Sequence, residues 1–293
     1  MRYTLLALPL IAQLEPRAVV YDCMDELSAF KDAPRQLRQR ENALLKMARL
    51  VFAGGPALYD AKRAVHPNVH CLPSGVDAGH FSPGRLSAHS AENERAHGIQ
   101  GALPRPRLGY FGVIDERLDT GLLAHLAAER PHWQFIMVGP VVKIDPAQLP
   151  RGPNIHWLGQ QPYELLPHLL AGWDVALLPF ALNDATRFIS PTKTLEYLAG
   201  GKPVVSTAIA DVIRLYGDAV SVAGDPAQFL EACDRALLES PQAAMQRHSS
   251  GAALVASHSW DSIAAAMLDR LEAELQATEA PASPQAGAAE SAP

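Results

Sequence analysis

A chain of 293 residues, of which 48% are hydrophobic and 19% charged, is long enough for two domains with separate cores, and its composition is neither disordered nor fibrous. Its net charge of -6, from 25 Lys and Arg against 31 Asp and Glu, argues against a nucleic-acid binder that depends on neutralising many phosphates. Its three cysteines lie far apart and form neither a metal-ligand pattern nor a disulfide framework. We therefore expect buried thiols in a reducing compartment.

The first twelve residues carry a charged start and a short apolar run, as a secretory signal does. No small-residue cleavage pattern follows, and the segment leads directly into an expected strand at 17–21. We therefore expect residues 1–12 to form part of a buried core. No stretch approaches the ~18 apolar residues of a membrane span, so the sequence predicts a cytoplasmic protein.

From residue 18 onward, short apolar runs alternate with segments whose apolar residues recur every three or four positions, a pattern typical of βαβ units. The first series has expected strands at 18–21, 50–53 and 69–72 and a charged helix at 35–49. Residues 84–106 are polar and have no apolar period, so we expect them to be a linker.

A second series of alternating segments begins at residue 107. Several of its apolar runs, such as 135–138 and 175–178, are nearly continuous, which indicates strands buried on both faces. The pattern predicts a doubly wound parallel sheet of an α/β fold. The expected strands are 108–111, 133–138, 155–158, 175–179, 203–206 and 219–222, and the expected helices are 121–130, 163–171, 192–199 and 226–238.

The loop after the expected strand at 175–179 carries the most informative pattern, because ligands bind at the carboxyl ends of parallel strands. Ser190 is a good N-cap and Pro191 suits the first helical position, so we expect a helix to begin there. Lys193 is unusual at the third helical position, where the helix dipole disfavours a cation unless an anion is bound. The free backbone N–H groups, Lys193 and the hydroxyls of Ser190 and Thr192 predict a phosphate site.

Glu196 lies three residues beyond Lys193 on the same face of the expected helix. Its carboxylate could reach past the phosphates to a ribose, so the pair indicates a site for a nucleoside diphosphate. The alternative is an ordinary capped helix with a surface Lys–Glu pair.

Two other loops that follow expected strands contribute Gly112 and Gly139, each of which would let a ligand approach the backbone closely. Arg117 follows the first of these glycines and could contact a diphosphate. An ion pair with Asp115 or Glu116 explains Arg117 equally well.

The order and spacing of these segments resemble the retaining-type GT-B glycosyltransferases, of the group 1 or family 4-like type, which include relatives of glycogen and sucrose synthases and many bacterial polysaccharide enzymes. The resemblance covers most of residues 18–240. It implies two Rossmann-like domains, of which the carboxy-terminal one holds the nucleotide sugar and the amino-terminal one the acceptor. Its landmarks are residues 19–22, 72–77, 81–83, 108–112, 138–139, 155–159 and 193–205.

Glu196 matches the second glutamate of the family's motif of two glutamates, which binds the donor ribose. The position of the first glutamate, which contacts the donor sugar, is Phe188 in this chain. The resemblance therefore implies that Asp184, from the same loop, replaces it or that the sugar is held differently.

A second departure follows Gly112, where the family often has an arginine that grips the diphosphate and this chain has Val113. Lys193, with Arg117 or Arg187, is expected to substitute for it. Lys193, Arg187 and the helix start would then stabilise the departing diphosphate. The resemblance implies no metal and no cofactor, since the nucleotide sugar is the substrate.

The resemblance also gives the expected domain boundaries. Residues 1–83 would be a partial, acceptor-side domain that lacks roughly half of a ~150-residue unit, and residues 107–275 the nucleotide-sugar domain with its closing helix. Residues 276–293, almost all small or polar, are expected to be a disordered tail. With an incomplete acceptor domain we expect poor sugar transfer by this chain, even where it binds nucleotide.

The sequence thus predicts a glycosyltransferase that moves a sugar, with a UDP-sugar as the expected donor, to a glycan or lipid-linked acceptor in bacterial polysaccharide or glycoconjugate synthesis. The alternatives are a catalytically silent nucleotide-binding module and a sugar-nucleotide epimerase. Asp22, Asp25 and Glu26 would face the acceptor, or else serve as turn and N-cap residues. The basic helix at 35–49 predicts weak peripheral contact with the inner face of a membrane, with a solvated face as the alternative.

Overall fold

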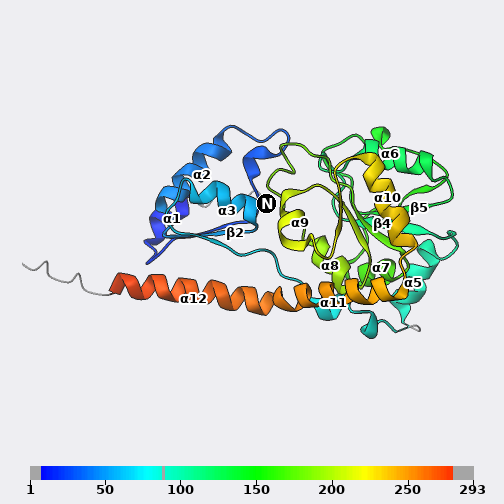
Figure 1. The fold of residues 1–293 in the computed structure, drawn as a ribbon. Helices are drawn as coiled ribbons and strands as arrows, with labels where there is room; N and C mark the ends of the chain where they lie inside the picture. Colours follow the sequence, from blue (N-terminus) through cyan, green and yellow to red (C-terminus); the bar gives the residue numbers. More distant parts are fainter. Residues whose placement is uncertain (1–7, 88–89, 280–293) are drawn as a thin grey trace, which may run out of the picture.

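The computed structural model describes residues 8–87 and 90–279, which form two lobes that lie side by side (Figure 1). The smaller lobe contains a three-stranded sheet, and the larger one a six-stranded sheet. Within the described residues, no helix is long and apolar enough to cross a bilayer.

The smaller lobe is built on parallel strands in the order β1-β2-β3, namely β1 (Val20–Cys23), β2 (Leu50–Ala53) and β3 (Val69–Cys71). The second and third strands form where the apolar runs predict them, and the first begins two residues later. Their helices are η2 (Leu27–Ala29), α2 (Gln36–Met47) and α3 (Pro56–Arg63). The side of α2 that carries Leu44 and Leu45 packs on the sheet, as its periodicity predicts.

The segment before β1 differs from its expected role as buried core. Residues Leu8–Leu14 form a short helix, α1, whose Leu10 and Leu14 are 56% and 74% exposed. Only Leu8 and Ile11 pack against the small core. A helix of about two turns has one narrow apolar side, so most of its leucines face solvent. Residues 1–7 of the signal-like run lie outside the described part of the chain.

The larger lobe confirms the doubly wound parallel sheet, with strand order β6-β5-β4-β7-β8-β9 and every neighbouring pair parallel. All residues of β4, β5, β7 and β8 are buried, as their continuous apolar runs predict. The strands are β4 (Arg107–Phe111), β5 (Gln134–Val138), β6 (Ile155–Trp157), β7 (Val175–Leu178), β8 (Val204–Thr207) and β9 (Ser221–Ala223).

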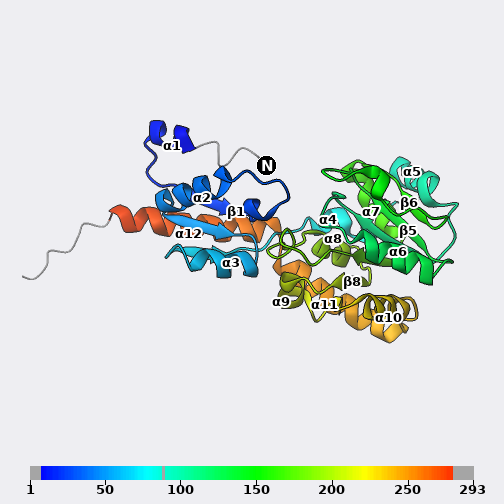
Figure 2. The ribbon, with the colours of Figure 1, turned by 90° about the horizontal axis from the view of Figure 1, so that it is seen from above.

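Helices cover both faces of this sheet (Figure 2). They are α6 (Thr120–Glu129), η4 (Pro146–Gln148), η5 (Tyr163–Leu165), α7 (Leu166–Ala171), α8 (Lys193–Ala199), α9 (Ala210–Tyr216), α10 (Pro226–Leu237) and α11 (Pro241–Ser257). The short α4 (Ala78–Phe81) and η3 (Pro83–Arg85) follow the smaller lobe in the chain, and α4 packs against α7 and α8 of the larger lobe.

The polar stretch at 84–106, expected as a linker, contains helix α5 (Ala91–Gln100). Ser90 caps α5 by accepting a hydrogen bond from the backbone N–H of Asn93 at 3.1 Å. Gln100, only 2% exposed, donates to the carbonyl of Leu169 and accepts from the indole N–H of Trp173. The helix is therefore attached to the larger lobe by a buried polar side chain, which an apolar periodicity does not reveal.

The last helix, α12 (Trp260–Glu279), does not close the larger lobe but runs back along the smaller one, where it packs against β2 (Figures 1 and 2). Asn68 donates a hydrogen bond to Glu274 of α12 at 2.6 Å. The helix includes residues 276–279 of the expected disordered tail, and the rest of that tail lies outside the described residues.

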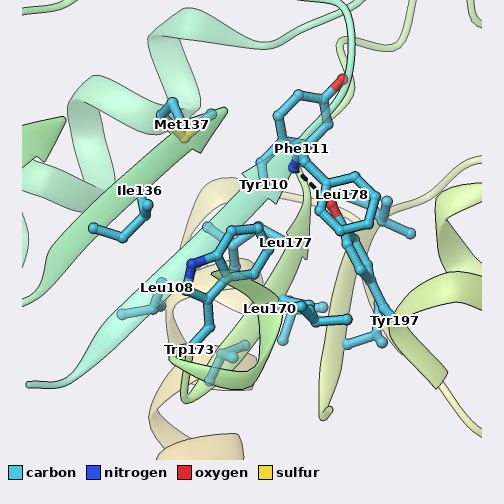
Figure 3. Packing of buried hydrophobic residues seen from close by; sticks show 14 of the residues in the cluster. Leu108, Tyr110, Phe111, Ile136, Met137, Leu170, Trp173, Leu177, Leu178 and Tyr197 are labelled. Atoms are coloured by element: carbon cyan, nitrogen blue, oxygen red, sulfur yellow. Dashed lines mark hydrogen bonds between the residues drawn. The ribbon is translucent and has the colours of Figure 1, made fainter. Parts of the chain in front are cut away.

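The core of the larger lobe is centred on aromatic side chains at β4 and the helices beside it (Figure 3). A Cβ on Gly109 would overlap the indole of Trp173, so the ring needs a glycine in the middle of β4. The hydroxyl of Tyr197, on α8, accepts a hydrogen bond from the backbone N–H of Phe111 at 2.9 Å. This contact holds α8 against the carboxyl end of β4.

Candidate functional site

The strand order of the larger sheet places a topological switch point between β4 and β7. The chain runs outward from β4 to β6 on one side and from β7 to β9 on the other. Ligands of such sheets bind outside the carboxyl ends of the two strands at the switch point. The loops that begin at Gly112 and at Pro179 are therefore where a ligand is expected.

Lys193 lies at this switch point, folded against Gly112. Gly112 has a φ of +144°, and a Cβ on it would overlap the Cε of Lys193. Gly139, with a φ of +147°, passes so close to the carbonyl of Gly112 that a side chain would collide with it. In the structure the two glycines admit the lysine and a neighbouring backbone, and the expectation that they also let a ligand approach stays a prediction.

The ammonium of Lys193 is enclosed by aromatic rings, 5.6 Å from the ring centre of Tyr110 and 5.7 Å from that of Phe180. Within the described residues, no hydrogen bond or ion pair joins it to another group. Burial, together with the charge of the nearby Arg117, lowers its pKa to about 8, and Glu196, among other carboxylates, opposes the change. Lys193 is half-buried, and a cation that contacts only aromatic rings there is incompletely compensated, so an anion would lower its free energy.

Glu196 follows Lys193 by one turn of α8, as expected. Burial raises the pKa of its carboxyl group to about 7, and the charge of Lys193 opposes the rise. The pKa of Lys193 is lowered and that of Glu196 is raised, so the two values approach each other. Such shifts are typical of groups kept away from water at a functional site.

The start of α8 differs from the expected cap. The helix begins at Lys193, with Thr192 as an N-cap whose side chain makes no capping hydrogen bond. The preceding residues form a tighter turn, in which the N–H of Thr194 donates to the carbonyl of Pro191 at 3.1 Å. Ser190 therefore does not cap the helix, and lies against Gly55 of the smaller lobe. Thr192 is exposed and remains free to contact a ligand.

Arg117 is held by Asp115, the alternative that the sequence left open. Its Nε and Nη2 donate to the two carboxylate oxygens at 2.9 and 2.7 Å. The guanidinium also lies 5.3 Å from the ring centre of Phe30, in the smaller lobe. Arg117 thus reaches the lobe interface beside Lys193, with part of its charge neutralised.

Asp184 and Arg187 are exposed, and no hydrogen bond or ion pair joins either of them to Lys193. Arg187 lies over the ring of its neighbour Phe188, at 5.2 Å. Phe188 packs against the core of the smaller lobe. The residue at the position of the family's first glutamate therefore joins the two lobes instead of facing Lys193.

Asp25 approaches this site from the loop after β1. Burial raises the pKa of its carboxyl group, and the positive charges of Arg117 and Lys193 counteract part of the rise. The sequence identified Asp25 as a candidate from its place after a strand. It did not identify Tyr110 or Phe180, because aromatic residues at strand ends have the same pattern as ordinary core.

Solved structures of known proteins share this arrangement. HepE from Anabaena, in a structure titled as a complex with UDP and glucose, aligns over 92% of this chain and 75% of its own, with a TM-score of 0.75 and 17% identity. Sucrose-phosphate synthase from Thermosynechococcus elongatus aligns over 88% of this chain and 68% of its own, with a TM-score of 0.66 and 19% identity. Two lobes that meet at the carboxyl ends of their parallel strands define the GT-B fold.

The sequence comparisons agree with the fold. Residues 105–239 match the family described as "Glycosyl transferases group 1". The Bacillus subtilis protein named "Putative teichuronic acid biosynthesis glycosyltransferase TuaH" is 27% identical over 257 residues, which is 80% of this chain. The chain spans 62% of the length of that relative. The larger lobe thus carries the match to the group 1 glycosyltransferases, and the resemblance seen in the sequence is confirmed.

Proposed function

We propose that this protein transfers a sugar from a nucleoside diphosphate sugar, with UDP as the nucleotide, to the hydroxyl of a glycan or lipid-linked acceptor. The proposal rests on the half-buried ammonium of Lys193, which lies over two aromatic rings and makes no ion pair within the described residues, at the switch point of the larger sheet. The structures of HepE in complex with UDP and glucose and with UDP-glucose support the choice of nucleotide. The Bacillus subtilis relative supports a role in cell-surface polysaccharide synthesis.

In the proposed reaction, the bond between the anomeric carbon and the diphosphate oxygen breaks, and the acceptor oxygen bonds to that carbon and releases its proton. Lys193 would neutralise the charge that develops on the departing diphosphate, in a site where low polarity strengthens the interaction. Glu196 would accept hydrogen bonds from the ribose. Arg187 and Asp184 would contact the diphosphate and the donor sugar from the exposed loop before α8.

Two measurements together test the proposal. Calorimetry with UDP reports whether the nucleotide binds, and release of UDP from a UDP-sugar, with and without added glycan acceptors, reports turnover. Binding with turnover supports the transferase. Binding without turnover favours a silent nucleotide-binding module, and absence of any nucleoside diphosphate binding would remove the proposal.

The affinity for UDP should pass through a maximum between about pH 7 and pH 8. Above about 8 the free protein loses the proton of Lys193, while the complex keeps it because the diphosphate raises the pKa of the ammonium, so binding weakens. Below about 7 Glu196 takes up a proton and accepts ribose hydrogen bonds less well. Calorimetric titrations across this range measure both sides of the profile.

Two variants separate the sources of this pH profile. Lys193→Met should remove the alkaline decline, and Glu196→Gln should reduce the acidic one. The terminal phosphate of UDP itself titrates near ~6, so the remaining acidic decline in Glu196→Gln belongs to the ligand. A profile that both variants leave unchanged would contradict the assignment of the two groups.

We also propose weak contact with anionic membranes through residues 35–49, which include α2. The single acidic residue of this segment, Glu41, is buried, so the exposed charges are all positive. Each basic residue contributes only ~1 kcal/mol near an anionic surface, so binding should be weak and sensitive to salt. Charge reversal of Arg38, Arg40 and Lys46 should abolish co-sedimentation with phosphatidylserine vesicles, whereas reversal of Arg95, Arg151 and Arg235 on the larger lobe should not. Equal sedimentation of all forms would reject the contact.

A further inference from the structure

A carboxylate of the larger lobe caps a helix of the smaller lobe. Asp211, in the first turn of α9, has a side chain with no solvent exposure. Its Oδ1 accepts a hydrogen bond from the backbone N–H of Ala57, in the first turn of α3, at 2.9 Å. The N-cap of α3 is Gly55, which has no side chain to serve this N–H. The cap that α3 lacks in its own lobe is therefore supplied by the other lobe, across the face where α3 meets α9 (Figure 1).

Position 55 must be a glycine because of this contact, and not because of its backbone conformation. Its φ of −177° is ordinary extended backbone, open to any residue. A Cβ at this position would overlap Oδ2 of Asp211 and lie 2.8 Å from the Cβ of Ser190. Two segments of the larger lobe thus press against the turn between β2 and α3, and one of them is the loop that leads to Lys193.

The second oxygen of the same carboxylate, Oδ2, is buried and has no hydrogen-bond partner in the described part of the chain. The charged and titratable groups that face it are Arg214 and Tyr216 on α9, Asp60 on α3 and Cys71 on β3. Burial raises the pKa of Asp211 from 3.8 to about 6, against the effects of the Ala57 N–H and of Arg214.

The neighbouring ion pair contributes less than this cap. Arg214 and Asp60 join α9 to α3 at 2.7 Å, but their side chains are about half exposed, and exposed pairs contribute little. The hydrogen bond from Ala57 is buried, and leaving a helix N–H without a partner in a closed interface is costly. The position of the lobes therefore depends more on Asp211 than on the ion pair.

We propose that Asp211 is a positioning residue that holds the two lobes closed by capping α3, and so fixes the distance between the smaller lobe and Lys193. Its kinetic consequence rests on the proposed transferase function, whereas the cap itself does not. Loss of the cap should separate the lobes and lower kcat, because acceptor and donor are then misplaced, by up to ~100-fold for a shift of about 1 Å. Binding of UDP, whose proposed contacts all lie in the larger lobe, should be unchanged.

The cap also predicts how closure depends on pH. In the open form Asp211 is hydrated and its pKa returns toward 3.8, while in the closed form it is about 6. The closed form therefore binds a proton more tightly, so closure is favoured as pH falls through about 6 and weakens as pH rises through that range.

Small-angle scattering, UDP calorimetry and donor kinetics of three variants test the proposal. Asp211→Ala removes the acceptor, and Gly55→Ala keeps it but forces a methyl group into the interface. Both should increase the radius of gyration and lower kcat with no change in the Kd for UDP. Asp211→Asn keeps an oxygen that can accept from Ala57, so it should stay compact, with dimensions that no longer depend on pH. Asp60→Ala is the matched control, a carboxylate of the same interface whose loss should change little.

Wild-type dimensions and kcat in both Asp211→Ala and Gly55→Ala would overturn the proposal. If Asp211→Ala fails to fold, as circular dichroism would show, Gly55→Ala and the pH dependence of Asp211→Asn decide instead. If the wild-type protein binds no UDP, the proposed function fails, but the scattering measurements still decide whether Asp211 holds the lobes together.

Discussion

Replacement of Lys193 by Met should weaken UDP binding by about 1.5 to 3 kcal/mol, the range for a hydrogen bond to a charged group, or roughly 10- to 100-fold in Kd. Met retains the apolar stem that packs over Gly112 and beside Tyr110 and Phe180, so the change removes charge and little else. Isothermal calorimetry measures the affinity directly.

The same substitution should leave the free protein as stable as the wild type, or more stable. The Lys193 side chain is half-buried and makes no ion pair within the described residues, so removal of its charge relieves a desolvation cost. A rise in Tm together with a loss of affinity is the expected signature of a residue kept for binding at the expense of stability. Replacement of a residue with only a structural role would lower the Tm.

Two companion variants sharpen this test. Glu196→Gln should reduce the preference for UDP over 2′-deoxy-UDP, because the carboxylate is proposed to bind the ribose. Arg235→Ala, an exposed residue of α10 paired only with Glu231, is the matched control for loss of one positive charge. Wild-type binding by both Lys193→Met and Glu196→Gln would show that the two residues are an ordinary helix pair.

Replacement of Lys62 by Met should destabilise the smaller lobe by about 3 to 5 kcal/mol, because it leaves two buried carboxylates without their counter-ion. The ammonium of Lys62 lies 2.6 Å from Glu26 and 2.7 Å from Glu41, and all three side chains are largely buried. Tyr21 also donates to Glu41, at 2.9 Å. Hydrogen exchange of β1 and β2 measures the stability of this lobe separately from the larger one.

The expected loss depends on pH in a defined direction. Burial alone would raise the pKa of Glu26, but hydrogen bonds from Lys62 and Ser28 lower it below its usual value. The pair of Lys62 and Glu26 therefore stabilises the protein when the pH lies above the usual pKa of a glutamate. This stabilisation is lost as the pH falls through the lowered pKa of Glu26. The deficit of Lys62→Met should accordingly shrink in acid.

The triple variant Lys62→Met, Glu26→Gln and Glu41→Gln should recover much of the stability, since no unpaired charge remains. Arg63→Ala, next in sequence but exposed, with an ion pair to Asp60 and a ring contact to Tyr59, should have little effect. Equal and small effects of Lys62→Met and Arg63→Ala would show that the buried cluster does not hold the lobe together.

Local sequence was sufficient for the elements that lead to the site. The runs that became β4, β5, β7 and β8 are apolar at nearly every position because helices cover both faces of the sheet, and such runs can be read without knowledge of the fold. The order of these elements placed a ligand at the carboxyl ends of β4 and β7. Lys193 stood out because a cation at a helix start conflicts with the helix dipole.

The sequence alone could not predict which distant residues contact the site and its helices. The backbone turn before α8 decided that Ser190 faces Gly55 and leaves the helix uncapped, although its sequence has the pattern of an N-cap. Helix α5 was missed because its attachment depends on one buried glutamine. The expected closing helix was assigned to the larger lobe because its partner strand, β2, lies far away in the sequence, in the other lobe.

By itself, then, the sequence determined the parallel α/β sheets, the family resemblance and the pair of Lys193 and Glu196, because each depends on residues close together in the chain. Only the tertiary structure decided that Lys193 lies over two aromatic rings, that Arg117 is held by Asp115, and that Asp211 caps α3. The last contact joins residues 154 positions apart. Periodicity and capping patterns report interactions within a few turns of a helix or strand, whereas burial, desolvation and a lobe interface depend on which distant segments meet.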